Sequence, residues 1–357
     1  MGKAAKICIK LFLIIIIIFI MGIAGLLAFL TITEYKPGNI EKLPINGQVS
    51  DEADFSKDIK FISWNVGYCG LGKGADFFMD GGKNVVSQTK SEVDDNIDKI
   101  TDKLRQFDAD VILLQEVDRK SYRSYNMDEE KLIADKLSGM LSSFAINLKA
   151  LFIPYPIPPI RNVEAGIMSL SKLKAESAER VSLPVPFKWP ERTCNLKRCL
   201  LVEKLPISGS DKKLVVINLH LEAYDSGEGK VAQTKALLDI MEKEYKEGNY
   251  VVAGGDFNQS FSNVDLSEFE VGNKGLWKPG RIETEDFEEN FNLYMDASVP
   301  TCRSLDRAYD KADDKFQYYV IDGFITSKNV EVISQKTIGL DFENSDHNPI
   351  EMVIRLK

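Results

Sequence analysis

The amino-acid sequence predicts an α/β sandwich, in which two stacked sheets carry helices on their outer faces, preceded by one transmembrane helix. Three observations lead to this prediction. Helical and strand-like patterns alternate through the early part of the chain, and strand-like runs dominate the later part. Residues 11–30 form an apolar run without a charge. We therefore expect the 357 residues to form an anchor followed by one large domain.

The apolar run, LFLIIIIIFIMGIAGLLAFL, is long enough to cross a bilayer as a helix. Its length is about 30 Å at about 1.5 Å per residue, which equals the thickness of the hydrocarbon core. A cleaved signal peptide, the competing interpretation, usually has a shorter apolar region of about 7 to 15 residues and a small-x-small cleavage site. We therefore expect a cytoplasmic tail at 1–10 and a transmembrane anchor at 11–32. Three lysines precede the run, so the positive-inside rule places the rest of the chain outside the cytoplasm.

Residues 33–58 are expected to form a linker, because they are polar, contain proline and glycine, and show neither a helical nor a strand period. The pattern that follows continues to the carboxyl terminus without a second linker. We therefore expect one soluble domain at 59–357.

Within this domain, helical periodicity predicts helices over 96–107, with Asn96 as the cap, and over 129–142 and 231–245. Apolar and β-branched runs predict the strands. These strands are expected at 60–68, 110–118, 167–172, 195–205, 213–221, 250–258, 318–327, 329–335 and 349–356.

Three stretches do not fit either pattern. Residues 151–160, LFIPYPIPPI, are apolar but contain four prolines, so they are not expected inside a helix or an interior strand. They either pack on the core of the domain or rest on a membrane or an apolar substrate. Residues 259–316 form a long acidic connection, and residues 67–82 form a Gly- and Asp-rich loop that lies either on the surface or against a substrate.

The composition limits the classes of function. Apolar residues make up 44% of the chain, which is enough for a large core. Lys and Arg total 45 against 54 Asp and Glu, a net charge of -9, and the part from Glu34 onward has 42 basic against 54 acidic residues, or -12. This balance disfavours a protein that holds nucleic acid by neutralising many phosphates. The five cysteines show no C-x-x-C spacing, and the spacing leaves open whether Cys194 and Cys199 pair.

Polar residues suited to metal or phosphate chemistry follow several of the predicted strands, in the motifs SWN, LLQEVD, INLHL, AGGDFN, YVIDGF and SDHNP. The residues are Asn65, Glu116, His220, Asp256, Asn258, Asp322, Asp346 and His347. Taken singly, each has an ordinary explanation as a solvated strand end, a turn or a structural histidine. Both histidines of the chain lie in these motifs, however, and burying such groups costs on the order of several kcal/mol unless they are paired or bind metal. The combination therefore predicts a functional site.

The series WN, QE, NLHL, GDFN, IDGF and SDHNP, in this order, resembles the endonuclease/exonuclease/phosphatase superfamily, which includes deoxyribonuclease I, abasic-site endonucleases, sphingomyelinases and inositol polyphosphate 5-phosphatases. The resemblance spans residues 60–357, and GDFN and SDHNP are its most specific motifs. It implies a four-layer α/β/β/α sandwich of two stacked mixed sheets, a divalent-metal site at one end, and hydrolysis of a phosphate ester. The inositol phosphatases have a WCDR-type motif where this chain has YVIDGF, so that branch is not expected.

The resemblance implies four metal ligands. Asn65 and Glu116 would hold the ion, with Glu116 as the main ligand. Asp322 and Asp346 would complete the acidic cluster, near the same ion or a second one. Oxygen ligands suit Mg²⁺, with Mn²⁺ or Ca²⁺ as alternatives.

The resemblance also implies catalytic roles. Asp256 would orient and deprotonate the attacking water, and Asn258 would donate a hydrogen bond to a phosphate oxygen. His220 would contact the phosphate or assist the leaving group. His347 would act from the opposite side of the phosphorus, oriented and made more basic by Asp346.

These features predict a membrane-anchored, metal-dependent phosphoesterase that acts on a lipid head group or a small phosphodiester. One alternative is a cell-surface nuclease that acts on DNA or RNA, which the acidic charge disfavours. Another is a non-catalytic binding domain that retains the fold, which the intact polar set disfavours. The expected partners are a phosphate-ester substrate and the membrane, and no protein partner is inferred.

Overall fold

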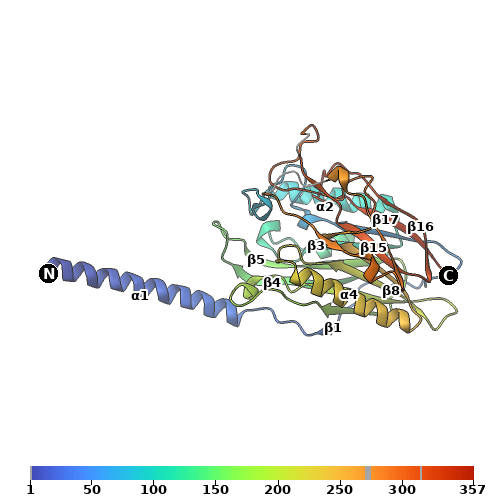
Figure 1. Ribbon diagram of the computed structural model, residues 1–357, viewed down its shortest axis with the longest axis horizontal. Helices are drawn as coiled ribbons and strands as arrows, with labels where there is room; N and C mark the ends of the chain where they lie inside the picture. The colour runs from blue at the N-terminus through green and yellow to red at the C-terminus, as the bar shows by residue number, and fades with distance from the viewer. Residues whose placement is uncertain (1, 270–274, 314–315) are drawn as a thin grey trace.

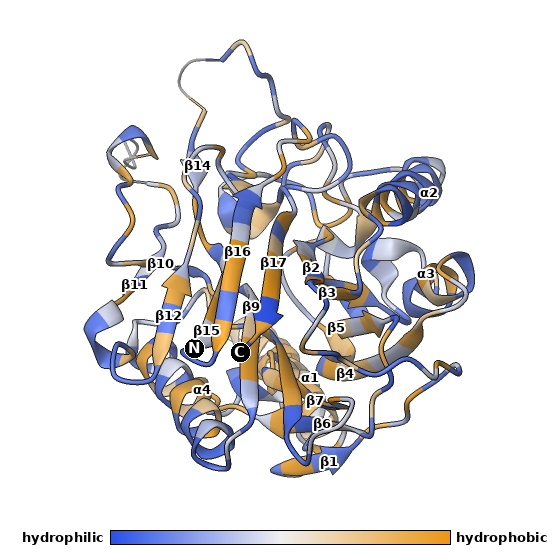
Figure 2. Ribbon diagram, turned by 90° about the vertical axis from the view of Figure 1, so that its right-hand side faces the viewer, coloured by the Kyte–Doolittle hydropathy of each residue, from blue (hydrophilic) through white to orange (hydrophobic). Residues whose placement is uncertain are grey.

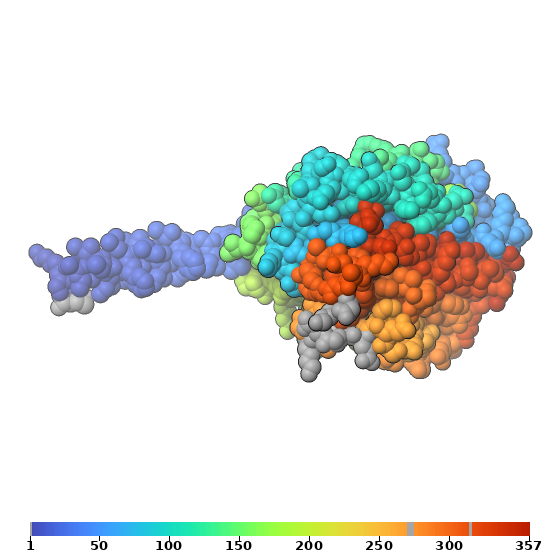
Figure 3. Space-filling view, turned by 90° about the horizontal axis from the view of Figure 1, so that it is seen from above, coloured from blue at the N-terminus to red at the C-terminus, as the bar shows by residue number. Residues whose placement is uncertain are grey.

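The computed structural model describes residues 2–269, 275–313 and 316–357. Its amino-terminal helix α1 (Lys3–Ile32) projects as a rod from a rounded domain (Figures 1 and 3). The 30 residues of α1 span about 45 Å. Side chains along the apolar run are exposed, and Leu30 is buried where the helix meets the domain. This helix is therefore long and apolar enough to cross a membrane.

Two mixed sheets form the centre of the domain. Within the described residues, one has seven strands in the order β1-β6-β7-β8-β9-β15-β12, and the other has six in the order β16-β17-β2-β3-β5-β4. The strands of the first are β1 (Ile40–Lys42), β6 (Ser177–Ser182), β7 (Cys199–Pro206), β8 (Lys213–His220), β9 (Tyr250–Asp256), β15 (Asp322–Ser327) and β12 (Phe291–Tyr294). Those of the second are β16 (Val330–Thr337), β17 (Ile350–Leu356), β2 (Ile59–Asn65), β3 (Val111–Asp118), β5 (Arg161–Ser171) and β4 (Leu141–Ile153). Two short pairs flank them, β10 (Gln259–Phe261) with β11 (Gly280–Ile282), and β13 (Cys302–Arg303) with β14 (Tyr318–Tyr319).

Long helices join the parallel neighbours at the centre of each sheet, because parallel strands need a crossover. Helix α2 (Lys90–Phe107) connects β2 to β3, and α4 (Glu228–Lys246) connects β8 to β9. Helices α2 and α3 (Glu129–Lys136) lie outside the six-stranded sheet, and α4 lies outside the seven-stranded sheet (Figure 2). Short 3₁₀ turns complete the chain: η1 (Gly67–Cys69), η2 (Phe78–Asp80), η3 (Tyr122–Ser124), η4 (Glu191–Cys194), η5 (Ser267–Phe269) and η6 (Thr284–Asp286).

The pleat of each strand distributes its side chains between two cores. In β2, Phe61 packs between the sheets, whereas Ile62 and Trp64 pack beneath α2. On the other side, Leu237 and Met241 of α4 cover the outer face of the seven-stranded sheet. The layers are therefore α/β/β/α, which confirms the predicted four-layer sandwich.

The structure corrects two helix boundaries. Helix α2 begins before the predicted start, because Thr89 and Glu92 form a capping box, and Asn96 lies buried inside the helix rather than at its cap. Helix α3 ends at Lys136 instead of 142, since Gly139 adopts a positive φ of 100° and β4 starts two residues later.

Three other stretches are more ordered than their patterns indicate. The expected linker contains β1, which pairs with β6 at the edge of a sheet. The long connection at 259–316 includes β12, another edge strand. Strand β4 extends to Ile153 at the other sheet's edge, so that residues 154–160 form the turn of the β4–β5 hairpin, where proline is tolerated.

Candidate active site

The site lies where the central strands of both sheets end. In the seven-stranded sheet, β8 and β9 run parallel and end side by side, so that His220 pairs with Asp256 in the ladder. Strand β15 runs antiparallel and starts at Asp322, directly opposite Asp256. Gly255 has a φ of 151°, and a Cβ there would lie 2.0 Å from the carbonyl oxygen of Leu219. The glycine of the AGGDFN motif thus permits the close approach of β8 that places Asp256 beside His220.

The six-stranded sheet contributes Asn65 and Glu116. Asn65 is the last residue of β2, and its Nδ2 donates to Glu116 Oε1 at 3.2 Å and to Asp256 Oδ2 at 3.0 Å. The register of β3 against β5 shifts between Leu114 and Val117, and Glu116 within this bulge has a φ of 55°. A left-handed glutamate costs on the order of 1–3 kcal/mol and persists only where surrounding contacts hold it. The bulge thus directs Glu116 toward the other sheet's carboxylates.

Asn258 also adopts a left-handed conformation, with a φ of 52°. Its backbone N–H donates to Asp256 Oδ1 at 2.8 Å, and its Nδ2 donates to the carbonyl oxygen of Leu221 at 2.9 Å. The backbone after β9 therefore orients the carboxylate of Asp256.

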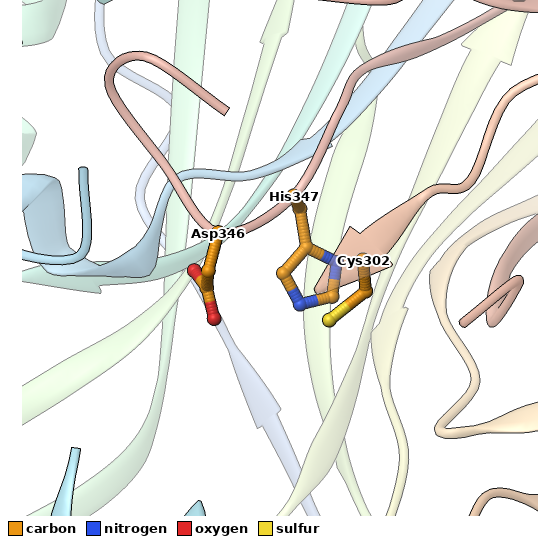
Figure 4. A group of neighbouring side chains, drawn as sticks. All are labelled: Cys302, Asp346 and His347. Atoms are coloured by element: carbon orange, nitrogen blue, oxygen red, sulfur yellow. The ribbon is translucent and has the colours of Figure 1, made fainter. Parts of the chain in front are cut away.

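The loop before β17 supplies Asp346 and His347. Trp64 Nε1 donates to the carbonyl oxygen of His347 at 2.9 Å, and Ser345 Oγ donates to that of Asn65 at 2.7 Å, so β2 fixes this loop. Figure 4 shows the imidazole of His347 between Asp346 and Cys302, and the three side chains offer ligand atoms within 4.8 Å of one another.

The structure corrects the expected partner of His347. Its Nδ1 lies 2.9 Å from Asp322 Oδ2, and Asp346 makes no hydrogen bond to the ring among the described residues. Asp322, and not Asp346, therefore orients this imidazole. Because Asp322 starts a strand next to β9, its carboxylate reaches behind the ring, whereas Asp346 points to the other side.

Burial shifts the pKa values of several groups in the site. Burial and the neighbouring Asp322 raise the pKa of Asp256 to about 7. Burial raises the pKa of Asp346 to about 6, with Glu116 adding to the rise. Burial and the nearby Arg198 lower the pKa of His220 well below its usual value, so its ring is neutral at pH 7.

The pKa of His347 shifts in the opposite direction. Burial by itself would lower this pKa, but Cys302 and Asp322 outweigh it and raise the pKa well above its usual value. Burial also raises the pKa of the Cys302 thiol to about 12. The two histidines of the site therefore differ in charge.

A pocket of about 570 Å³ opens over these groups. Six of the expected site residues line it: Glu116, His220, Asp256, Asn258, Asp346 and His347. Asn65 and Asp322 do not line it, and instead contact the lining carboxylates and imidazole from behind. The structure thus brings the whole predicted set together, with two members in supporting positions.

The pocket also contains residues that the sequence patterns did not single out. Tyr68, Met79 and Asp80 line it, so part of the 67–82 loop faces the pocket. Tyr224 Oη donates to Asp80 Oδ1 at 3.3 Å, and burial together with Asp346 raises the pKa of Asp80 to about 7. Tyr68, Met79 and Asp80 belong to the Gly- and Asp-rich loop at 67–82, for which a position against a substrate was one of the two expectations, whereas no pattern marked Tyr224.

Three arginines line the pocket although the core motifs contain none. Arg123 forms a bidentate pair with Asp118 and lies 3.8 Å from the centre of the Tyr68 ring. Arg198 lies 3.5 Å from Glu222, and Arg303 donates to backbone carbonyl oxygens. Carboxylates therefore partly compensate the charges of Arg123 and Arg198, whereas neutral carbonyl oxygens hold Arg303.

The donors at the base of the pocket suit a divalent cation. The carboxylates of Asp256 and Asp322 offer oxygen atoms within 4.8 Å of each other, and the carboxylates of Glu116 and Asp346 line the same pocket. The buried Oδ1 of Asp322 has no hydrogen-bond partner among the described residues. Carboxylate oxygens in such proximity repel each other unless a proton or a cation lies between them. The residues present thus fit a hard divalent ion.

Comparison with known proteins places this chain in a family of enzymes that hydrolyse phosphate esters. Residues 62–347 match the Endonuclease/Exonuclease/phosphatase family, and the chain belongs to it. No curated protein matches the sequence.

Several solved structures share the fold. An endonuclease/exonuclease/phosphatase from Beutenbergia cavernae DSM 12333 is 18% identical with a TM-score of 0.56, covering 84% of this chain and 72% of its own. The human Nocturnin catalytic domain with bound sulfate is 15% identical with a TM-score of 0.52, covering 88% and 98%. ANGEL2, a 2',3'-cyclic phosphatase in complex with adenosine-2',3'-vanadate, is 15% identical with a TM-score of 0.53, covering 88% and 99%. At this identity the likeness concerns the fold alone.

Proposed function

We propose that this protein is a membrane-anchored, metal-dependent phosphodiesterase whose substrate is a lipid head group or a small phosphodiester. One observation carries the proposal: Glu116, His220 and Asp256, from three strands, converge with Asp346 and His347, from the loop before β17, at the base of one pocket. Membership of a family of nucleases and phosphatases supports hydrolysis of a phosphate ester.

The proposed metal ligands are Glu116, with Asn65 beside it, and the carboxylate of Asp346. The Oδ1 of Asp322 is the proposed ligand of a second ion. Mg²⁺ is favoured because it takes oxygen ligands and keeps several waters, with Mn²⁺ and Ca²⁺ as alternatives. When bound, the ion supplies positive charge to the phosphoryl oxygens and to the leaving oxygen.

The chain's own residues supply the acid–base chemistry. Asp256, whose pKa burial raises to about 7, is the proposed base that takes a proton from the attacking water. The water oxygen bonds to phosphorus, the bond to one ester oxygen breaks, and that oxygen takes up a proton. The products are an alcohol and a phosphomonoester. Asn258 and the neutral His220 are placed to donate hydrogen bonds to phosphate oxygens, and His347, held by Asp322, is placed to stabilise the charge that develops.

The charge of the pocket favours a substrate with a single phosphate group over a nucleic acid. Arg123, Arg198 and Arg303 are each bound to protein groups, and the domain carries an excess of acidic residues. A nuclease that holds a long polyanion would need free cations along the strand.

The proposed topology places residues 1–10 in the cytoplasm and the catalytic domain outside it. The lysines before the apolar run support this orientation through the positive-inside rule.

The test is a hydrolysis panel with the full-length protein in detergent. DNA, RNA, sphingomyelin, phosphoinositides and a soluble phosphodiester are each assayed with Mg²⁺, Mn²⁺, Ca²⁺ or EDTA, and Asp256→Asn serves as the inactive control. We expect metal-dependent cleavage of a lipid or small ester that EDTA abolishes. Rapid cleavage of DNA alone would support the nuclease alternative, and no activity in any arm would support a binding domain.

A further inference from the structure

The pocket shares one wall with the end of the membrane helix. Six residues line the pocket and also pack in a single cluster with Leu26 and Leu30 of α1. The shared residues are Leu148, Ile153, Ile160, Val163, Ala165 and Cys194. One layer of side chains therefore separates the pocket from the helix that crosses the membrane.

Polar contacts fix the position of α1 against the domain. Trp189 Nε1 donates to Thr31 Oγ1 at 3.0 Å. The buried carboxylate of Glu34, just beyond the helix, lies 3.3 Å from both Arg192 and Lys197. The domain is thus docked on the end of α1, so one face of the domain is turned toward any bilayer that α1 crosses.

This face carries exposed apolar side chains. The hairpin tip (residues 151–160) exposes Leu151 by 59% and Ile157 by 96%, and the adjacent Trp189 is 54% exposed. In Figures 1 and 3 the green segment that contains the tip lies at the end of the domain where α1 joins it. Ile153 and Ile160 pack in the cluster shared with α1, whereas Leu151 and Ile157 are exposed. Core packing therefore explains only half of the apolar stretch.

The hairpin lies at the level where the apolar run of α1 ends, because Ile153 and Ile160 pack in one cluster with Leu26 and Leu30. The apolar run ends at Leu30, and Leu26 lies about 6 Å deeper along the helix. Apolar surfaces of peripheral proteins insert about 5–10 Å into the boundary between head groups and acyl chains. Tryptophan is enriched at this boundary, where Trp189 lies beside the last turn of α1.

The pocket also reaches the surface on this side. Tyr155 and Glu191 line the pocket and are exposed, and Glu191 belongs to η4, which packs against α1. The pocket meets solvent again at Met79 and Tyr224. One rim therefore faces the bilayer and another faces water.

We propose that the hairpin tip and Trp189 rest in the bilayer interface, and that the enzyme draws its substrate, a membrane lipid with a phosphodiester head group, directly from the bilayer in which it is anchored. The apolar wall shared with α1 accommodates the part of the lipid next to its acyl chains, while the phosphodiester reaches Asp256. This inference rests on the proposed phosphodiesterase activity and names its substrate class.

The test uses the full-length protein in vesicles of phosphatidylcholine, phosphatidylglycerol and sphingomyelin, with bis(p-nitrophenyl) phosphate as a soluble probe. Ile157→Glu places a charge on the bilayer-facing tip without touching the pocket. Val231→Glu, on an exposed position of α4 that is 69% accessible, is the matched control.

We expect Ile157→Glu to lower hydrolysis of vesicle lipid by about tenfold or more, because the docked orientation becomes a minor population. Its rate on the soluble probe should stay within about twofold of wild type, which also shows that it is folded. Leu151→Glu should behave in the same way, and Val231→Glu should match wild type on both substrates.

The outcomes separate this inference from the proposed function. Hydrolysis of the soluble probe with no hydrolysis of vesicle lipid by wild type overturns the inference alone, as does equal lipid hydrolysis by Ile157→Glu and wild type. Absence of hydrolysis of both substrates with every metal overturns the proposed function and the inference with it.

Discussion

Asp322 Oδ2 lies 2.9 Å from Nδ1 of His347, and this contact links the first residue of β15 to the loop before β17. It fixes the ring so that Nε2 faces Asp256, at 3.8 Å from Asp256 Oδ2. The contact gives His347 a negative partner and makes Asp322 a positioning residue.

Removing the carboxylate of Asp322 should lower the pKa of His347. Asp322 raises the pKa of His347, so Asp322→Asn should lower that pKa and reduce turnover by about 10- to 100-fold. The chain has only two histidines, so imidazole NMR signals followed against pH can be assigned with His220→Gln. Asp346→Asn is the control and should shift the His347 signal less. A larger shift from Asp346→Asn would contradict the assignment of Asp322 as the orienting group.

The carboxylates should make the protein's thermal stability depend on a divalent ion. A ligand that binds only the folded state at about 100 times its Kd adds about 2.7 kcal/mol to the free energy of unfolding. We therefore expect Mg²⁺ or Mn²⁺ to raise the Tm of wild type and to raise it much less in Glu116→Gln. Asp211→Ala, at an exposed loop position, should respond like wild type. An equal rise in Glu116→Gln would show that the ion binds elsewhere.

Single substitutions at the base of the pocket should abolish most activity and leave the fold intact. Glu116→Ala, Asp256→Ala and His347→Ala should each lower turnover at least about a hundredfold, the scale of acid–base and electrostatic contributions. The circular dichroism spectrum should not change, because these groups lie at strand ends. Asp211→Ala is again the control. Wild-type rates in all three variants would place the active site elsewhere.

Glu203 should make stability depend on pH independently of the active site. It lies buried in β7, and burial raises its pKa from 4.5 to about 7. A group with a raised folded-state pKa contributes its full stability below about pH 4.5 and loses it as the pH rises through about 7. Glu203→Gln should therefore flatten the fall in unfolding free energy across this window, by about 2 kcal/mol or more. A fall as steep as that of wild type in chemical denaturation would contradict this role.

The anchor should hold the protein in the membrane with the domain outside. After a high-salt wash the protein should stay in the membrane fraction, since the apolar run, and not charge, retains it. Protease added to intact cells should remove the domain. Protection of the domain would reverse the proposed orientation, and release into the medium would indicate cleavage of the amino-terminal segment.

Local patterns in the sequence were sufficient for much of the architecture. The uncharged run at 11–30 predicted α1, and the period of apolar residues predicted the central strands and helices, because burial of one face imposes a repeat on neighbouring residues. The polar residues that end those strands, such as His220 and Asp256, marked the site for a similar reason: the ends of neighbouring parallel strands lie together at one edge of a sheet. Edge elements such as β1 were missed, since an edge strand is paired on one side only and its sequence carries little periodicity.

Tertiary structure alone decided the contacts between residues far apart in the chain. His347 contacts Asp322 rather than Asp346, which precedes it in the sequence. This contact forms because β15 pairs with β9, and no local pattern predicts that pairing. In the same way, the packing of Leu30 in one cluster with residues of the β4–β5 hairpin depends on where that hairpin lies relative to α1. The sequence determined which residues are apolar or chargeable and at what spacing. The packing of the sheets determined which of them touch, because such contacts form only when long segments close on one another and bury their shared surface.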